Sequence, residues 1–76
     1  MNHKVLVIDD EADIRATVEI LLGRMHLDSW AVDSVSAAIA ELQRSAYDLV
    51  LCDMRLGDGL GLDVVRWINE FKPQMP

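Results

Sequence analysis

The sequence is poor in cysteine, in basic residues and in long apolar runs, and each shortage excludes a class of protein. One cysteine in 76 residues cannot form an internal disulfide and fits a reducing compartment. Seven basic against 13 acidic residues give a net charge of −6, which disfavours direct binding to nucleic acid or an anionic membrane. No apolar run approaches the roughly 18 residues that span a bilayer, and no signal-like leader opens the chain. We therefore expect a cytoplasmic protein.

Apolar residues, by contrast, are abundant. They make up 51% of the chain, which indicates a packed core and argues against disorder. The length leaves room for one small domain, which would bury only about 60–65% of its unfolded surface and would be marginally stable alone.

Two apolar runs end in aspartate, and they are the most informative pattern in the chain. Residues 5–8 precede Asp9 and Asp10, and residues 49–52 precede Asp53. Such runs predict strands that are buried on both faces, as in parallel sheets. Adjacent parallel strands end at the same sheet edge, where open α/β sheets bind ligands, so the three aspartates should share one pocket. Crowded carboxylates repel one another unless neutralised, and Mg²⁺ suits such oxygen ligands.

The remaining periodicity predicts alternating strands and helices. The expected elements are a strand at 4–9, a helix at 12–25, a strand at 29–32, a helix from 36, a strand at 47–52 and a helix at 62–71. The first helix should bury one stripe, formed by Ile14, Val18, Leu21, Leu22 and Met25. Asp10 or Glu11 should cap its first turn. This order is typical of an α/β fold with a parallel sheet and crossover helices.

The chain ends at Pro76, directly after the third helix, where a further strand would be expected to begin. Three parallel strands make a thin sheet. We therefore expect residues 1–76 to be part of a domain, with one side of the third strand unpaired. An exposed strand edge is a template for pairing with another chain, so we expect a two-fold homodimer formed by antiparallel pairing of that strand with its copy.

Three segments together resemble the receiver domain of bacterial two-component response regulators. They are residues 5–11 (VLVIDDE), 47–56 (YDLVLCDMRL) and 59–62 (GLGL), and their order and spacing match over the whole chain. The resemblance implies a flavodoxin-like (CheY-like) fold with strand order 2-1-3, reduced to the first three strand–helix units of a partial receiver domain. Residues 53–56, followed by Asp58 and Gly59, are most similar to receivers of transcriptional activators that work with the alternative sigma factor.

The same resemblance implies a function. Asp53 would accept a phosphoryl group from a sensor histidine kinase, and the full-length parent would regulate an output such as transcription. Asp10 would bind Mg²⁺ directly, Asp9 mainly through water, and Arg55 through its backbone carbonyl. The chain would be a signalling module and not an enzyme. Gly57 departs from the family, which usually has proline there, and frees the loop behind Asp53.

Other readings of these residues stay open. Asp9, Asp10 and Glu11 alone could be a helix cap. Asp53 could be the nucleophile of a phosphatase-like hydrolase, although such sites typically need a second carboxylate where this chain has Arg55. A structural or dimerising half-domain is also possible, because the residues that read the phosphate in complete receivers would follow Pro76. Cys52 is expected to be an inert core residue.

Overall fold

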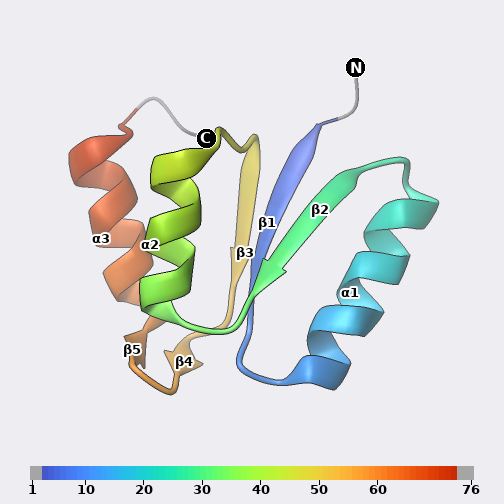
Figure 1. The fold of residues 1–76 in the computed structure, drawn as a ribbon, viewed down its shortest axis with the longest axis horizontal. Coiled ribbons are helices and arrows are strands. Elements are labelled where there is room, and N and C mark those ends of the chain that lie inside the picture. The colour runs from blue at the N-terminus through green and yellow to red at the C-terminus, as the bar shows by residue number, and fades with distance from the viewer. Residues whose placement is uncertain (1–2, 74–76) are drawn as a thin grey trace.

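The computed structural model describes residues 3–73, so both ends of the predicted 1–76 receiver segment lie outside the described residues. Figure 1 shows the elements along the chain. They are β1 (Lys4–Ile8), α1 (Ala12–Arg24), β2 (Asp28–Val32), α2 (Val35–Arg44), β3 (Leu49–Cys52), β4 (Arg55–Leu56), β5 (Gly59–Leu60) and α3 (Gly61–Phe71).

The main sheet has the predicted order β2-β1-β3, and all of its pairs are parallel. Val5 in the central strand lies opposite Ser29 on one side and Leu49 on the other. Alternate side chains of β1 enter two separate cores. Leu6 and Ile8 pack with residues of α2 and α3, whereas Val5 and Val7 pack with Leu22 of α1. The helices therefore cover opposite faces of the sheet, as the crossover prediction requires.

Burial of β3 on both faces was predicted wrongly, and the strand begins at Leu49 rather than at residue 47. Leu49 and Leu51 are 43% and 40% exposed. Their partners in β1 are Val5 and Val7, so they lie on the α1 face of the sheet. In the described chain α1 packs mainly against β1 and β2, and it leaves this face of β3 partly exposed.

The first helix also differs from its prediction. Of the expected stripe, Leu22 is buried and Val18 is half-buried, but the exposed fractions of Ile14, Leu21 and Met25 are 42%, 51% and 65%. The side-chain cap is absent too, because the N-cap residue Glu11 makes no such bond. Instead the Glu11 N–H donates to the Asp9 carboxylate at 2.9 Å.

The sequence did not reveal the β4–β5 hairpin. Arg55 pairs with Leu60 and Leu56 with Gly59, in antiparallel register. Strands of two residues are too short to show a hydrophobic period. Leu56 nevertheless anchors the hairpin in the α2–α3 core, where it is 8% exposed.

The starts of α2 and α3 lie one residue before their predicted positions. Ser34 caps α2, and its hydroxyl accepts a hydrogen bond from the Ala37 N–H at 3.1 Å. Gly61 begins α3, and its N–H donates to the Met54 carbonyl at 2.9 Å. A Cβ at Gly61 would lie 2.2 Å from the Asp53 carbonyl oxygen, so only glycine fits this close approach.

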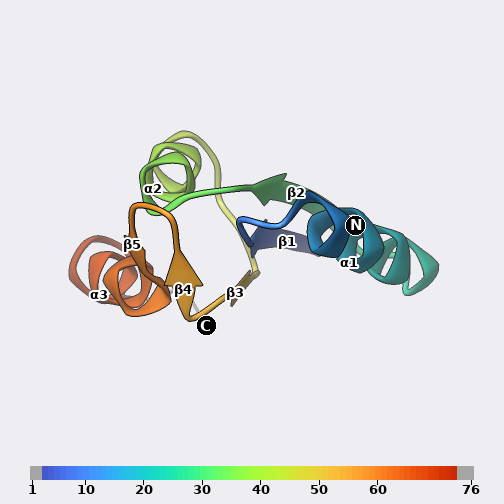
Figure 2. The same ribbon diagram turned by 90° about the horizontal axis from the view of Figure 1, so that it is seen from below.

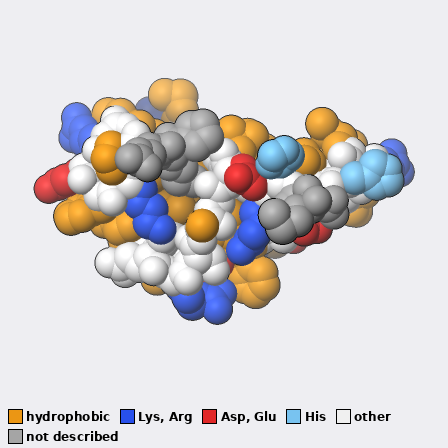
Figure 3. Space-filling model, turned by 90° about the horizontal axis from the view of Figure 1, so that it is seen from above, with side chains coloured by type: hydrophobic (Ala, Val, Ile, Leu, Met, Phe, Trp, Pro, Cys, Tyr) orange, Lys and Arg blue, Asp and Glu red, His pale blue; other side chains and the backbone are white. Residues whose placement is uncertain are grey.

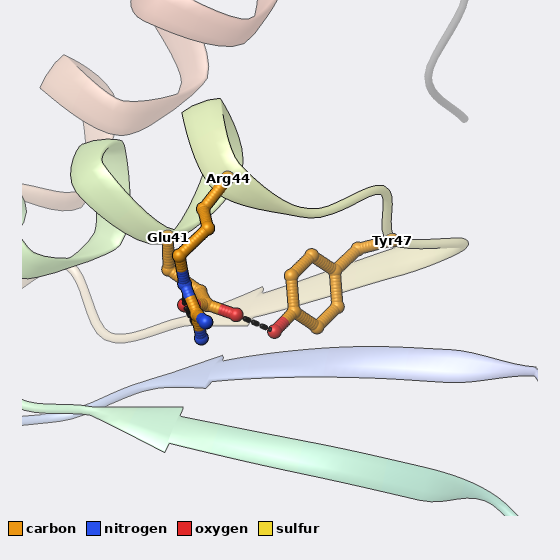
Figure 4. Close-up of polar contacts among 3 residues, drawn as sticks. All are labelled: Glu41, Arg44 and Tyr47. Atoms are coloured by element: carbon orange, nitrogen blue, oxygen red, sulfur yellow. Dashed lines mark hydrogen bonds and ion pairs between the residues drawn. The ribbon is translucent and has the colours of Figure 1, made fainter.

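One acidic side chain is buried far from the carboxyl edge of the sheet. Glu41, on α2, accepts hydrogen bonds from the Tyr47 hydroxyl and from the Arg44 guanidinium, the latter at 2.7 and 3.0 Å (Figure 4). The Arg44 guanidinium also lies 5.9 Å from the Trp30 ring. These contacts join α2 to β2 and to the segment before β3. Within residues 3–73, no helix has the length and apolar character needed to cross a membrane.

Candidate functional site

The carboxyl edge of the sheet is held by hydrogen bonds that continue the strand ladders. The Asp9 N–H donates to the Val32 carbonyl at 3.1 Å, and the Asp53 N–H donates to the Ile8 carbonyl at 2.9 Å. Asp9 and Asp53 are therefore fixed at neighbouring strand ends, on the edge that faces the viewer in Figure 2.

The three aspartates predicted to meet do lie together. Asp9, Asp10 and Asp53 each offer one carboxylate oxygen, and these oxygens are all within 4.8 Å of one another. Oxygen ligands around an octahedral Mg²⁺ at about 2.1 Å lie about 3.0 or 4.2 Å apart. Small side-chain rotations would bring the carboxylates to that spacing, so the residues present fit a hard divalent cation.

Backbone amides orient two of these carboxylates. One oxygen of Asp9 accepts from the Glu11 N–H at 2.9 Å, and one oxygen of Asp53 accepts from the Met54 N–H at 2.7 Å. Each side chain can present its second oxygen to an ion. The third member, Asp10, is exposed.

The opposite edge of the sheet differs in charge. Figure 3 shows that face, on which Lys and Arg side chains cover more of the surface than Asp and Glu side chains do. The acidic cluster is thus a local feature of the carboxyl edge, in a chain whose net charge is −6.

Arg15 is a site residue that the sequence analysis missed. Its guanidinium donates to the Asp9 backbone carbonyl at 2.8 Å, so a positive charge lies beside the cluster. The sequence contained a signal, because Arg15 follows Glu11 by four residues, about one helical turn. In the structure the Arg15 N–H donates to the Glu11 carbonyl at 3.1 Å. A long side chain one turn into a helix points back toward the helix N-terminus, which here adjoins Asp9.

Arg55 begins β4 and lies outside the three-carboxylate cluster. It borders an open groove of about 900 Å³ beside Asp53, and the other residues that line this groove are mainly apolar. The groove is lined by Cys52, Asp53, Met54, Arg55, Leu60, Gly61, Leu62 and Val65. The metal-binding role predicted for the Arg55 carbonyl stays a prediction.

Cys52 adjoins the site without the properties of a nucleophile. It is half-buried, and its thiol lies 3.2 Å from the Asp53 carbonyl oxygen. Burial, followed by the negative charges of Asp53 and Asp9, raises the pKa of the thiol above its ordinary value. The thiolate is therefore disfavoured, in agreement with the inert role predicted for this residue.

Comparison with known proteins identifies the family. Residues 5–76 match the response regulator receiver domain, and the chain belongs to that family. It is 51% identical over 74 residues to the response regulator protein PilR of Pseudomonas aeruginosa, and 38% identical over 72 residues to the transcriptional regulatory protein ResD of Bacillus subtilis. These alignments cover 97% and 91% of this chain.

Solved receiver structures have the same fold. The non-phosphorylated HemR receiver domain of Leptospira biflexa superimposes with a TM-score of 0.91 at 25% identity, covering 99% of this chain. The response regulator TrrA of Thermotoga maritima, solved in complex with Mg²⁺-BeF, also gives 0.91, at 27% identity and 96% coverage. The predicted flavodoxin-like fold and receiver family are thereby confirmed.

The chain corresponds to only part of these proteins. It spans 17% of PilR and 29% of ResD, and 60% and 63% of the HemR and TrrA chains.

Proposed function

We propose that this chain is the phosphoacceptor module of a two-component system, with Asp53 as the acceptor and a sensor histidine kinase as the donor. One observation carries the proposal: an oxygen of Asp53 lies within 4.8 Å of oxygens from Asp9 and Asp10, at the carboxyl edge of a receiver fold. The other two carboxylates have no evident task in holding the sheet together, whereas a phosphoryl acceptor that works with a cation needs such neighbours.

The chemistry assigned to Asp53 is in-line phosphoryl transfer. One Asp53 carboxylate oxygen attacks the phosphorus, and the bond from phosphorus to the kinase histidine nitrogen breaks. That nitrogen recovers a proton from solvent, and an acyl phosphate stays on Asp53. The bond from the Met54 N–H would fix the orientation of the Asp53 carboxylate in the site.

Asp9, Asp10, Asp53 and the Arg55 carbonyl are proposed to hold Mg²⁺, Asp10 directly and Asp9 mainly through water. When bound, the ion would neutralise charge on the transferred phosphoryl oxygens. The fit of the three carboxylates and the Mg²⁺-BeF complex of TrrA both support this choice of ion.

We propose that the full-length protein is cytoplasmic and that its output is the regulation of transcription. It is supported by relatives that include the transcriptional regulators ResD and AlgB. In this scheme the chain is a signalling module and not an enzyme. A hydrolase is less well supported, because Arg55 occupies the position where a second carboxylate would act.

We further propose that the segment of residues 1–76 forms a homodimer through β3. Among the described residues β3 pairs only with β1, and Leu49 and Leu51 are exposed beside its unpaired edge. Antiparallel pairing of two β3 strands would satisfy the unpaired edge and bring the exposed leucines of the two chains next to each other.

Incubating the protein with a small acyl-phosphate donor and Mg²⁺, followed by mass spectrometry, tests the phosphoacceptor proposal. We expect one phosphoryl group on the wild type and none on Asp53→Asn. The matched control Asp13→Asn alters an exposed aspartate of α1 and should be labelled like the wild type. Removing Mg²⁺ with a chelator should abolish labelling. Equal labelling of Asp53→Asn and the wild type would refute the assignment, and multiple turnovers of the donor would indicate a hydrolase.

A further inference from the structure

The hairpin that follows Asp53 is bonded to the start of a distant helix. Asp58, in the turn between β4 and β5, accepts a hydrogen bond from the Val35 N–H at 2.8 Å and another from the Ser36 N–H at 3.0 Å. The two partners lie 23 and 22 residues away in the sequence. Figures 1 and 2 both show the hairpin beside the first turn of α2.

These bonds add to a local cap and do not replace one. Ser34 already caps α2 through the Ala37 N–H. Asp58 supplies the acceptors for the two preceding amides, and its negative charge suits the positive end of the helix dipole. The bonds from Ser36 and Val35 lower the pKa of the Asp58 carboxyl, so the side chain is ionised at neutral pH.

The rest of the hairpin is attached at its base. The Gly61 N–H donates to the Met54 carbonyl at 2.9 Å, and the Leu60 N–H donates to the Asp63 carboxylate at 2.9 Å. Leu56 enters the core between these points. The tip, at residues 57 and 58, is bonded to α2 through the carboxylate of Asp58.

That connection matters because the hairpin itself is short. It contains only two residue pairs, Arg55 with Leu60 and Leu56 with Gly59. An isolated hairpin is marginally stable at best, and this one has glycine on both sides of Asp58. Without the anchor at the tip, only the base of the hairpin and Leu56 would hold it, and the backbone of Met54 and Arg55 would be less firmly fixed relative to Asp53.

We infer that Asp58 is a positioning residue for the phosphoacceptor site: by fixing the hairpin to α2, it holds the Arg55 carbonyl and the Met54 N–H where the site needs them. This inference rests on the proposed function, because its test by Mg²⁺ binding needs the proposed metal site. The Met54 N–H bonds to Asp53, so the bonds from Asp58 to α2 also help to set the orientation of the acceptor carboxylate.

Mg²⁺ titration of the full-length protein, followed by NMR, tests the inference with three variants. Asp58→Ala removes both bonds, and Asp58→Asn retains one oxygen acceptor. Ser34→Ala is the matched control, because it removes the Ala37 cap of the same helix and leaves the Asp58 carboxylate in place. Residues that hold metal ligands in place typically contribute about 10-fold to 100-fold to metal affinity. We expect Asp58→Ala to weaken Mg²⁺ binding about 10-fold, Asp58→Asn by less, and Ser34→Ala hardly at all.

Hydrogen exchange at the Gly61 amide is measured in parallel, because it reports the Met54–Gly61 bond whether or not an ion binds. Exchange should be faster in Asp58→Ala than in Ser34→Ala when the two are compared at equal global stability. Unchanged exchange and affinity in Asp58→Ala, or equal losses in Asp58→Ala and Ser34→Ala, would overturn the inference. If the wild type fails to bind Mg²⁺, the metal site of the proposed function is refuted, and the exchange comparison alone decides the role of Asp58.

Discussion

At the scale of single residues, the buried carboxylate of Glu41 shows how a charge is accommodated in so small a core. It is 7% exposed, and bonds from Tyr47 and then from Arg44 hold its pKa below the ordinary value. Burial, followed by the bond to Glu41, raises the pKa of Tyr47, so its hydroxyl stays a donor. The ammonium of Lys4 lies 4.7 Å from the centre of the Tyr47 ring. Each polar group thus has a partner of the right kind.

Replacing Tyr47 by phenylalanine should destabilise the fold. The variant removes a hydrogen bond to a charged group and leaves a buried Glu41 oxygen unpaired, which costs about 1.5–3 kcal/mol. Urea denaturation of the wild type, Tyr47→Phe, Glu41→Gln and the double variant measures the coupling. An equal cost of Tyr47→Phe in both backgrounds would show that the lost stability comes from packing and not from this bond.

His26 is the described non-glycine residue with a positive φ, at 61°. It follows the end of α1, where the His26 N–H donates to the Gly23 carbonyl and the Leu27 N–H donates to the Leu22 carbonyl, both at 3.0 Å. This pair of bonds is the Schellman motif, which favours glycine at this position.

Substituting glycine for His26 should therefore stabilise the protein. A left-handed conformation costs a residue with a Cβ roughly 1–2 kcal/mol. Glycine avoids this cost, but it loses more conformational entropy on folding, which offsets part of the gain. We expect a net gain of about 0.5–1 kcal/mol in thermal or urea unfolding. His26→Ala is the control and should bring no gain. An equal gain in the alanine variant would assign the effect to the imidazole instead of the backbone.

At the scale of elements, the start of α3 determines how closely that helix approaches Asp53. Gly61 allows its first residue to pack against the Asp53 carbonyl and the Cys52 sulfur. Gly23, inside α1, has nothing within 4 Å of the position of a Cβ. The two glycines therefore make an informative pair.

Gly61→Ala should destabilise the fold and shift Asp53, whereas Gly23→Ala should stabilise it. The first variant places a methyl group 2.2 Å from a backbone oxygen, and overpacking of this kind typically costs about 1–3 kcal/mol. The second replaces a helical glycine by alanine, which should raise the free energy of unfolding by up to about 1 kcal/mol. Unfolding curves give both signs, and NMR shifts of Asp53 report the displacement. A neutral Gly61→Ala variant with unmoved Asp53 shifts would contradict the close contact.

At the scale of the whole molecule, apolar side chains are exposed on the face of the sheet that α1 covers only in part. They include Leu49 and Leu51 on β3 and Ile14 on α1. Ile14 and Leu51 border one shallow hollow, and exposed apolar clusters are typical of interaction sites. The arrangement follows from the position of α1 over β1 and β2, on the far side of the sheet from α2 and α3.

Replacing both Leu49 and Leu51 by lysine should abolish the proposed self-association of the 1–76 segment. Lysine on an edge strand blocks pairing with another sheet. Sedimentation at tens of micromolar should show a dimer for the wild type and a monomer for the double variant. Ile20→Lys, at an exposed position of α1, is the control and should leave the dimer intact. A well-folded wild-type monomer would exclude the β3 dimer.

The sequence by itself determined the alternation of strands and helices, the helix ends it predicted to within one residue, and the meeting of Asp9, Asp10 and Asp53, whereas the strand order came from the family resemblance. Continuous apolar runs and turn residues specify parallel strands locally, and parallel strands must end at one edge. The family resemblance supplied the proposed role of Asp53, which no local pattern contains.

Only the tertiary structure decided what each surface packs against. A local pattern shows that Leu51 and Leu21 are apolar, but their burial depends on which element lies above them, and here they stay 40% and 51% exposed. The β4–β5 hairpin has too few residues for a periodic signal, and the bonds from Asp58 to α2 cross 22 and 23 residues of sequence. Long-range contacts of this kind arise from the folded arrangement of elements, because no local preference of the chain encodes them.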